Sequence, residues 1–200
     1  PSGSGADRIY SLDTLPQEYS TCGVGDYRLA SAAVEQPDGS LLLDLRYASH
    51  EIRPGKYALE GLPAFFGREG WETLSTLLRD PCSGIEAELL YGVCEEDDLI
   101  TRAVRLTNRG DRPAALCRAM SLCLDFNRAD LDLVTCDGGH VKERNLNRAA
   151  LRPGVQSVGS LRGTSSHQHN PFVILCEQDA GEDHGLCYGA ALLYSGNFLA

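Results

Sequence analysis

Two histidines lie two residues apart in the segment Arg162–Pro171, which reads RGTSSHQHNP. On a β-strand, His167 and His169 would point to the same side and could share a metal ion. Cupin-type metal barrels use this spacing, but their pattern also has a glutamate three or four residues later. Here the next glutamate is Glu177, so the spacing favours a polar loop whose Ser and Asn side chains bond to nearby backbone amides, and we predict no metal site.

Other catalytic patterns are missing from the sequence. The nucleophile motif G-x-S-x-G and the phosphate-binding motif GxxxxGK[ST] do not occur. The acidic run Glu95–Asp98 places four carboxylates side by side, but like charges between two strands are typical of a solvated hairpin tip. No pattern in these residues indicates a catalytic centre or a bound cofactor.

The segment Asp44–Ala64 carries basic groups in an otherwise acidic protein. It leaves a predicted strand and then contains Pro54, Gly55, Gly61 and Pro63, which indicate irregular backbone. Long shaped loops in compact domains are usually functional or disordered. Two interpretations stay open, a solvated connecting loop and a recognition or interface surface formed by Arg46, His50, Arg53 and Lys56.

Composition limits the classes of partner. With 28 acidic and 18 basic residues the formal net charge is −10, so the chain repels polyanions and we predict no nucleic-acid partner. A hydrophobic content of 42% is typical of a folded globular chain. No run approaches the roughly 20 apolar residues of a membrane-spanning helix, and no export signal is visible at the start. We therefore expect no membrane partner and a cytoplasmic location.

The eight cysteines form no CxxC pair. Several lie in apolar runs, as Cys117 and Cys123 do, where a free thiol behaves as a small core hydrophobe. We predict buried, reduced cysteines, as a reducing cytoplasm favours; disulfides and metal binding are the alternatives.

The elements that position these residues are predicted to be strands. Apolar residues alternate with polar ones in 41–47, 85–93 and 100–107, the pattern of half-buried strands. The turn residues of Asn108–Pro113 predict a hairpin between the third strand and the apolar run Ala114–Leu124. That run suits either a helix or a strand buried on both faces, and we favour the strand.

Four shorter apolar runs continue the pattern, at Leu131–Cys136, Val155–Val158, Phe172–Cys176 and Tyr188–Tyr194. Segments rich in Gly, Asp, Asn and Pro separate them. Strands at this spacing predict an all-β fold, a β-sandwich of mostly antiparallel strands, rather than βαβ units. We expect a single domain over residues 1–200. Since the chain has no initiator Met and stops within an apolar sequence, we also expect a fragment of a larger protein.

Taken together, several segments resemble the N-terminal domain of bacterial alpha-galactosidases of glycoside hydrolase family 36. The strings RGTSSHQHNPF and YSGNFLA are specific, and the resemblance covers almost the whole chain in order. The segments are Ser11–Tyr19, Gly25–Arg28, Asp44–Ala64, Ile100–Arg102, Pro153–Ser157, Arg162–Phe172 and Tyr194–Ala200.

The resemblance implies an N-terminal β-supersandwich followed by a (β/α)₈ catalytic barrel and a small C-terminal β domain. Family members hydrolyse terminal alpha-galactosyl residues of melibiose- and raffinose-type sugars with retention, which requires two carboxylates about 5 Å apart. In the family both are barrel aspartates, and the nucleophile lies in a Lys-Trp-Asp motif. The only tryptophan here, Trp71, stands between Gly70 and Glu72, so the resemblance implies a chain without the catalytic pair, inactive by itself.

Family tetramers bring the N-terminal domain of one subunit towards the active-site mouth of another. The resemblance therefore implies two partners, the chain's own barrel and neighbouring subunits. In the longer enzyme we predict an active-site wall or interface role for Arg46, His50, Arg53 and Lys56, because their side chains are donors suited to sugar hydroxyls or to acidic residues of another subunit.

Two other functions were weighed. A stand-alone carbohydrate-binding module would stack sugars on exposed aromatic rings, but aromatic residues make up only 7% of the chain, with one Trp. A small metal enzyme would use His167 and His169, whose surrounding spacing does not fit.

Overall fold

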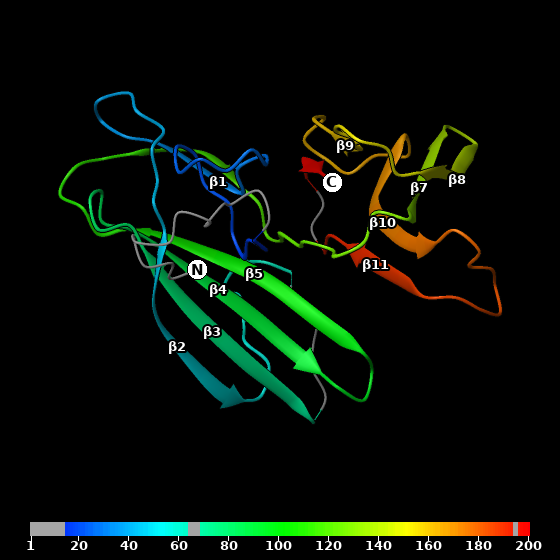
Figure 1. The fold of residues 1–200 in the computed structure, drawn as a ribbon, viewed down its shortest axis with the longest axis horizontal. Helices are drawn as coiled ribbons and strands as arrows, with labels where there is room; N and C mark the ends of the chain where they lie inside the picture. The colour runs from blue at the N-terminus through cyan, green and yellow to red at the C-terminus, as the bar shows by residue number, and fades with distance from the viewer. Residues whose placement is uncertain (1–14, 64–68, 194–195) are drawn as a thin grey trace. The chain divides into compact units, whose positions relative to one another are not determined.

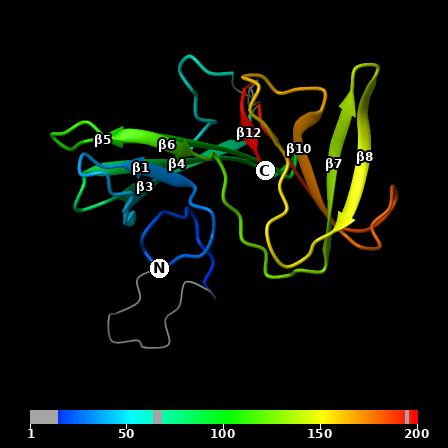
Figure 2. The same ribbon diagram turned by 90° about the horizontal axis from the view of Figure 1, so that it is seen from above.

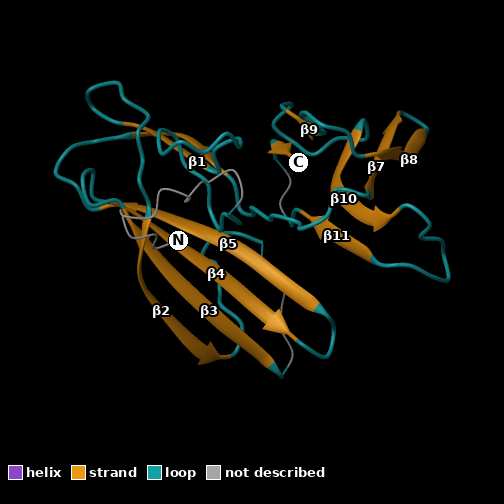
Figure 3. Ribbon diagram, viewed as in Figure 1, coloured by secondary structure: helices purple, strands orange, loops and turns teal. Residues whose placement is uncertain are grey.

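The computed structural model describes residues 15–63, 69–193 and 196–200. Within these ranges all regular structure is β-strand, as Figure 3 shows by its orange arrows and teal loops. The ranges contain no helix, and so none that could cross a bilayer. The predicted all-β fold class is confirmed. Parts of the segments quoted above lie outside the described residues, namely Ser11–Thr14, Ala64 and Tyr194–Ser195.

The chain divides into two compact units. The first comprises Pro1–Ala58 with Phe65–Asp125, and the second comprises Leu59–Ala64 with Phe126–Ala200. Each has its own sheets and its own buried residues. A single domain over residues 1–200 stays a prediction.

The first unit contains two antiparallel sheets (Figure 1). The larger one has the order β2-β3-β4-β5, and its strands are β2 (Arg46–Pro54), β3 (Trp71–Arg79), β4 (Ile85–Cys94) and β5 (Leu99–Asn108). The smaller one pairs β1 (Ala32–Glu35) with β6 (Ala115–Ala119).

A shared apolar core joins these two sheets into a sandwich. On β4, Ala87 and Leu89 face the core and are fully buried, while Glu86 and Glu88 alternate with them on the other face. Val34 of β1 belongs to the same core cluster. The period-two pattern of 85–93 therefore predicted the strand and its core-facing residues Ala87 and Leu89, but the prediction of a half-buried strand was wrong in part, since Glu86 and Leu90 on the other face are also buried.

The second unit repeats the arrangement of a four-stranded and a two-stranded sheet. The larger sheet has the order β11-β10-β7-β8, and Figure 2 shows β7 and β8 side by side as a long hairpin. Its strands are β7 (Leu131–Gly139), β8 (Lys142–Ala150), β10 (His169–Glu177) and β11 (Cys187–Ala191). The smaller sheet pairs β9 (Gly159–Ser160) with β12 (Phe198–Leu199). Buried residues of this unit include Leu131, Val158 and Phe198.

The prediction of an irregular loop over Asp44–Ala64 was wrong for its first half. Strand β2 occupies Arg46–Pro54, and the strand predicted over 41–47 begins only at Arg46. Leu43 is fully buried, but its N–H donates to the carbonyl of Cys22 rather than to a strand ladder. Because β2 is a sheet edge with all nine residues exposed, no apolar alternation marks it in the sequence.

The predicted hairpin between 100–107 and Ala114–Leu124 was also wrong. Strand β5 pairs with β4 through the exposed turn Glu95–Asp98, which confirms the hairpin tip predicted there. Strand β6 pairs with β1 instead, and it is mostly exposed rather than buried on both faces. The strand predicted at Val155–Val158 is irregular backbone next to β9.

All eight cysteines are free thiols in the structure. Only Cys94 and Cys176 are buried, so the prediction of general burial was wrong. Cys82, Cys117 and Cys187 are exposed, because short edge strands and turns leave even apolar runs open to solvent.

Replacing Leu89 by Ala should lower the free energy of unfolding of the first unit by about 2–5 kcal/mol, because a fully buried side chain leaves a cavity. Leu116→Ala on β6 is the matched control, since Leu116 is 57% exposed and should cost under about 1 kcal/mol. Urea denaturation of both variants measures the difference. Equal losses would contradict this core assignment.

Thiol labelling of the native protein with Ellman's reagent should modify Cys82, Cys117 and Cys187 first. Cys94 and Cys176 should react only on unfolding, because burial limits access and raises the pKa of the Cys176 thiol. Unfolded protein without reductant should yield all eight thiols. A Cys176 that reacts as fast as Cys187 would refute the burial.

Candidate functional site

The four basic residues selected from the sequence do not converge on one point. Arg46 and Arg53 lie opposite Arg79 and Thr73 of β3, on one face of the sheet. His50 lies opposite Thr76 and therefore on the other face. Strand β2 thus presents basic groups on both sides of an exposed edge.

Two of these groups have polar neighbours on the same strand or just before it. The Arg46 guanidinium pairs with Asp44 at 2.6 Å, and hydrogen bonding to that carboxylate raises the pKa of Arg46. His50 Nδ1 lies 2.6 Å from the hydroxyl of Tyr47. Arg53 makes no ion pair or hydrogen bond through its side chain within the described ranges, so its five donors are open to an outside partner.

Lys56 follows the strand and packs against aromatic rings. Its Nζ lies 4.5 Å from the ring centre of Tyr57 and 5.9 Å from that of Trp71, and burial lowers the pKa of Lys56. Gly92 makes this approach possible, because a Cβ there would lie 3.3 Å from Lys56 Cγ and 2.6 Å from the hydroxyl oxygen of Thr101. Lys56 is therefore positioned by packing rather than by a flexible loop.

A hollow of about 680 Å³ opens where β2 ends. Its walls combine the buried ring of Trp71 with carboxylates, and the residues around it are Pro54, Gly55, Glu69, Gly70, Trp71, Glu72, Val93 and Glu95. Sequence reasoning missed this hollow, because its walls come from separate strands and their turns. The sequence marked Pro54 and Gly55 as turn residues and Glu95 as part of an acidic hairpin tip, but gave no sign that they lie around one hollow.

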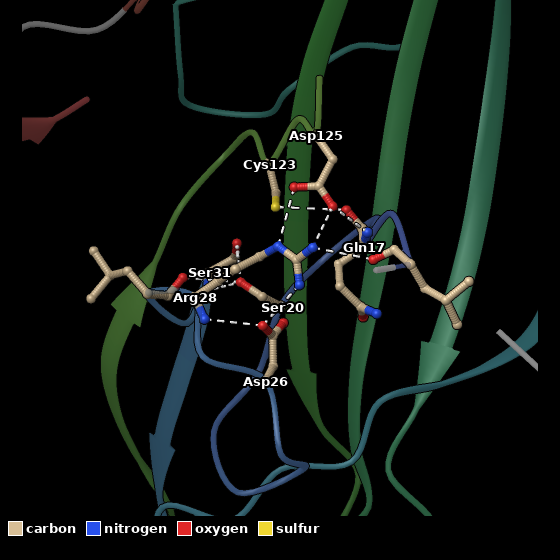
Figure 4. Close-up of polar contacts among 9 residues, drawn as sticks. Gln17, Ser20, Asp26, Arg28, Ser31, Cys123 and Asp125 are labelled. Carbon is tan, nitrogen blue, oxygen red and sulfur yellow. Dashed lines mark hydrogen bonds and ion pairs between the residues drawn. The ribbon is translucent and has the colours of Figure 1, made fainter. Parts of the chain in front are cut away.

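A buried ion cluster lies elsewhere in the first unit (Figure 4). The Arg28 guanidinium bonds to Asp26 at 2.9 Å and to both carboxylate oxygens of Asp125, at 3.0 and 3.2 Å. It also donates to the carbonyl of Leu15 at 3.2 Å. Burial lowers the pKa of Arg28, but the two carboxylates outweigh it and the pKa is raised. The Arg28 side chain is 17% exposed and that of Asp26 only 1%, so each charge is compensated by its partner rather than by water.

A second buried cation is Arg102, whose side chain is 5% exposed. Its guanidinium lies 4.0 Å from the ring centre of Tyr91 and 3.5 Å from Glu18. Burial lowers the pKa of Arg102 and raises that of Tyr19 nearby to about 12. Both arginine clusters bind the N-terminal segment to the sheets, which is a structural role.

The two histidines of the HxH pattern have different surroundings. His169 Nδ1 lies 2.8 Å from Asp137 across the β7–β10 pair, while the His167 side chain makes no hydrogen bond within the described residues. In that part of the chain, no group of three His, Cys, Asp or Glu side chains could hold a metal ion.

Replacing Arg28 by Ala should destabilise the first unit by about 3–5 kcal/mol, because it strands the buried Asp26 carboxylate. Arg46→Ala is the matched control, since its pair with Asp44 is solvent-exposed and should contribute far less to stability. Chemical denaturation gives both values, and an Arg28→Ala loss no larger than that of the control would contradict the role of the cluster.

Comparisons with known proteins place these features in a family. The model described as the glycosyl hydrolase family 36 N-terminal domain matches residues 2–200. The bifunctional alpha-galactosidase/sucrose kinase AgaSK of Mediterraneibacter gnavus is 47% identical over 99% of this chain and 21% of that protein. Alpha-galactosidase AgaA of Geobacillus stearothermophilus is 43% identical over 100% of this chain and 28% of that protein.

Solved structures agree with the sequence comparison. The crystal structure of the alpha-galactosidase AgaB from Geobacillus stearothermophilus matches with a TM-score of 0.95 and 43% identity, over 100% of this chain and 28% of that chain. A variant of AgaA in complex with raffinose matches with a TM-score of 0.95 and 42% identity over the same shares. The chain spans 21–28% of the length of these relatives. It belongs to the glycosyl hydrolase family 36 N-terminal domain family.

Proposed function

We propose that this chain is the non-catalytic N-terminal β domain of an alpha-galactosidase. The longer enzyme would release terminal alpha-galactosyl residues from melibiose- and raffinose-type sugars by a retaining mechanism. The observation that carries the proposal is the match of the whole chain to a small part of much longer alpha-galactosidases. The absence of the Lys-Trp-Asp motif around Trp71 supports it, because the family's nucleophile would then lie outside these 200 residues.

In the longer enzyme the domain would support the catalytic barrel, form subunit interfaces and contribute to the wall of a neighbouring active site. Its partners would be the catalytic barrel of the same polypeptide and neighbouring subunits of a homo-oligomer, in the cytoplasm. Rigid sheets with buried cores suit such a role, because side chains on rigid elements are positioned more precisely than side chains on mobile loops.

Strand β2 is the part of the domain that we propose for the wall. Arg46, His50 and Arg53 are exposed on an edge strand whose other side is fully paired with β3, so their backbone is fixed while their side chains are accessible. Lys56 borders the carboxylate-lined hollow at the end of the strand through its contact with Trp71. Guanidinium, imidazole and ammonium donors suit sugar hydroxyls or the acidic residues of a neighbouring subunit.

In the longer enzyme, Arg53→Ala should raise KM for raffinose by about tenfold, the loss expected for one hydrogen bond from a charged donor. If Arg53 contacts a neighbouring subunit instead of the sugar, Arg53→Ala should weaken the association of the subunits. The kcat for a small nitrophenyl alpha-galactoside should change little, because the residue lies outside the catalytic pair. Steady-state kinetics and analytical ultracentrifugation measure these effects.

Arg53 is the sharpest choice because its substitution breaks no described contact, whereas His50 would lose Tyr47 and Lys56 would lose its ring packing. Arg112→Ala, in the turn after β5, is the matched control for removing one surface arginine. An unchanged KM for raffinose together with an unchanged oligomeric state would contradict both roles and show that Arg53 is only a solvated residue of the edge strand.

A further inference from the structure

The second unit contains an open hollow of about 560 Å³ that the proposed function does not use. One wall comes from the start of β8, with Glu143 and Arg144. The other comes from the RGTSSHQHN segment and the start of β10, with Ser166, His167 and Asn170. All of these residues belong to one compact unit.

The backbone of the RGTSSHQHN segment is held by contacts on both sides of the residues that line the hollow. Arg162 donates to the side chain of Gln168 at 2.7 Å, and the N–H of Gly163 donates to Asn197 at 2.7 Å. His169 pairs with Asp137 at 2.8 Å. None of the residues in these contacts lines the hollow, so they hold the segment without occupying the lining groups.

Gly138 fixes the approach of the two walls. Its N–H donates to the carbonyl of Gln168 at 3.1 Å, and a Cβ there would lie 2.3 Å from the carbonyl oxygen of Lys142 and 3.0 Å from that of His167. Next to it, Arg144 has a φ of 61°, a left-handed conformation that costs a non-glycine residue about 1 kcal/mol or more. Such conformations gather at ligand sites, where surrounding contacts maintain them.

Some of the polar side chains around the hollow are available to a ligand, although Glu143 already accepts a hydrogen bond from the N–H of Val141. Within the described ranges, the side chains of Ser166 and His167 make no hydrogen bond. Among the described residues, the Oδ1 of Asn170 is buried without a hydrogen-bond partner, which is costly unless a ligand supplies one. Backbone N–H groups hold the pKa of Glu143 below its usual range, so this carboxylate is an acceptor at neutral pH.

We propose that this hollow binds a neutral polyhydroxylated ligand, such as one ring of an oligosaccharide. The charges of Glu143 and Arg144 cancel, which disfavours a phosphate or a bare cation. Neighbouring hydroxyls of a sugar ring can donate to a carboxylate and accept from a guanidinium, while Ser166 and His167 supply groups that do both. No Phe, Tyr or Trp ring lines the hollow among the described residues, so we expect little stacking and a Kd in the millimolar range.

Titration of the 200-residue chain with raffinose, followed by ¹H–¹⁵N NMR, tests the proposal. The amide signals of Gly138, Ser166 and His167 should shift together with one millimolar Kd. His167→Ala and Ser166→Ala should each raise that Kd by about five- to tenfold, the loss of one or two hydrogen bonds. His140→Ala, in the exposed turn of the same hairpin, should leave it unchanged.

Three results would overturn the proposal. Raffinose and galactose could leave these signals unmoved up to their solubility limits. Inorganic phosphate could shift them instead, which would assign the hollow to an anion. The His140→Ala control could weaken binding as much as the lining variants. If His167→Ala loses the dispersed spectrum of a folded chain, Ser166→Ala decides the outcome. None of these results bears on the alpha-galactosidase assignment, because the hollow lies outside strand β2 and needs no catalytic group.

Discussion

The buried pairing of Arg28 with Asp26 and Asp125 is the constraint on which the first unit depends. It joins a residue near the start of that unit to one at its end, 97 positions apart in the sequence. An ion pair with an almost fully buried carboxylate is costly to break, because either partner alone would be an uncompensated charge. The cluster therefore fixes the segment before β1, whose Tyr19 completes the core that also contains Val34 and Leu89.

Once that core is closed, the four-stranded sheet becomes a rigid support for its edge. Strand β2 pairs with β3 from Arg46 to Pro54, so its backbone is ordered while all nine side chains remain exposed. The same principle applies in the second unit, where Arg162 and Gly163 hold a segment whose other side chains line a hollow. In both units buried or paired groups fix the backbone, and the exposed polar groups beside them are the ones we propose for recognition.

Sequence patterns predicted strands where apolar residues alternate or run together, and missed β2 and β8, which are exposed throughout, as well as the buried strands β1 and β3. The alternation in 85–93 and 100–107 reflects packing against a core, so β4 and β5 were found. Strand β2 has two solvated faces and leaves no such pattern, and the pairing of β6 with β1 depends on distant chain segments rather than on the local turn. The candidate basic residues were predicted, but their division between two faces follows from strand register, which composition does not encode.

Hydrolysis of a nitrophenyl alpha-galactoside distinguishes a non-catalytic domain from a chain that carries its own active site. The longer enzyme and this 200-residue chain should be purified from a host that lacks alpha-galactosidase and assayed side by side. We expect turnover by the longer enzyme and none above buffer by the chain alone, because we propose that the catalytic carboxylates lie outside these 200 residues. Turnover by the chain that disappears when one of its own carboxylates is changed, as in Glu72→Gln, would contradict the account.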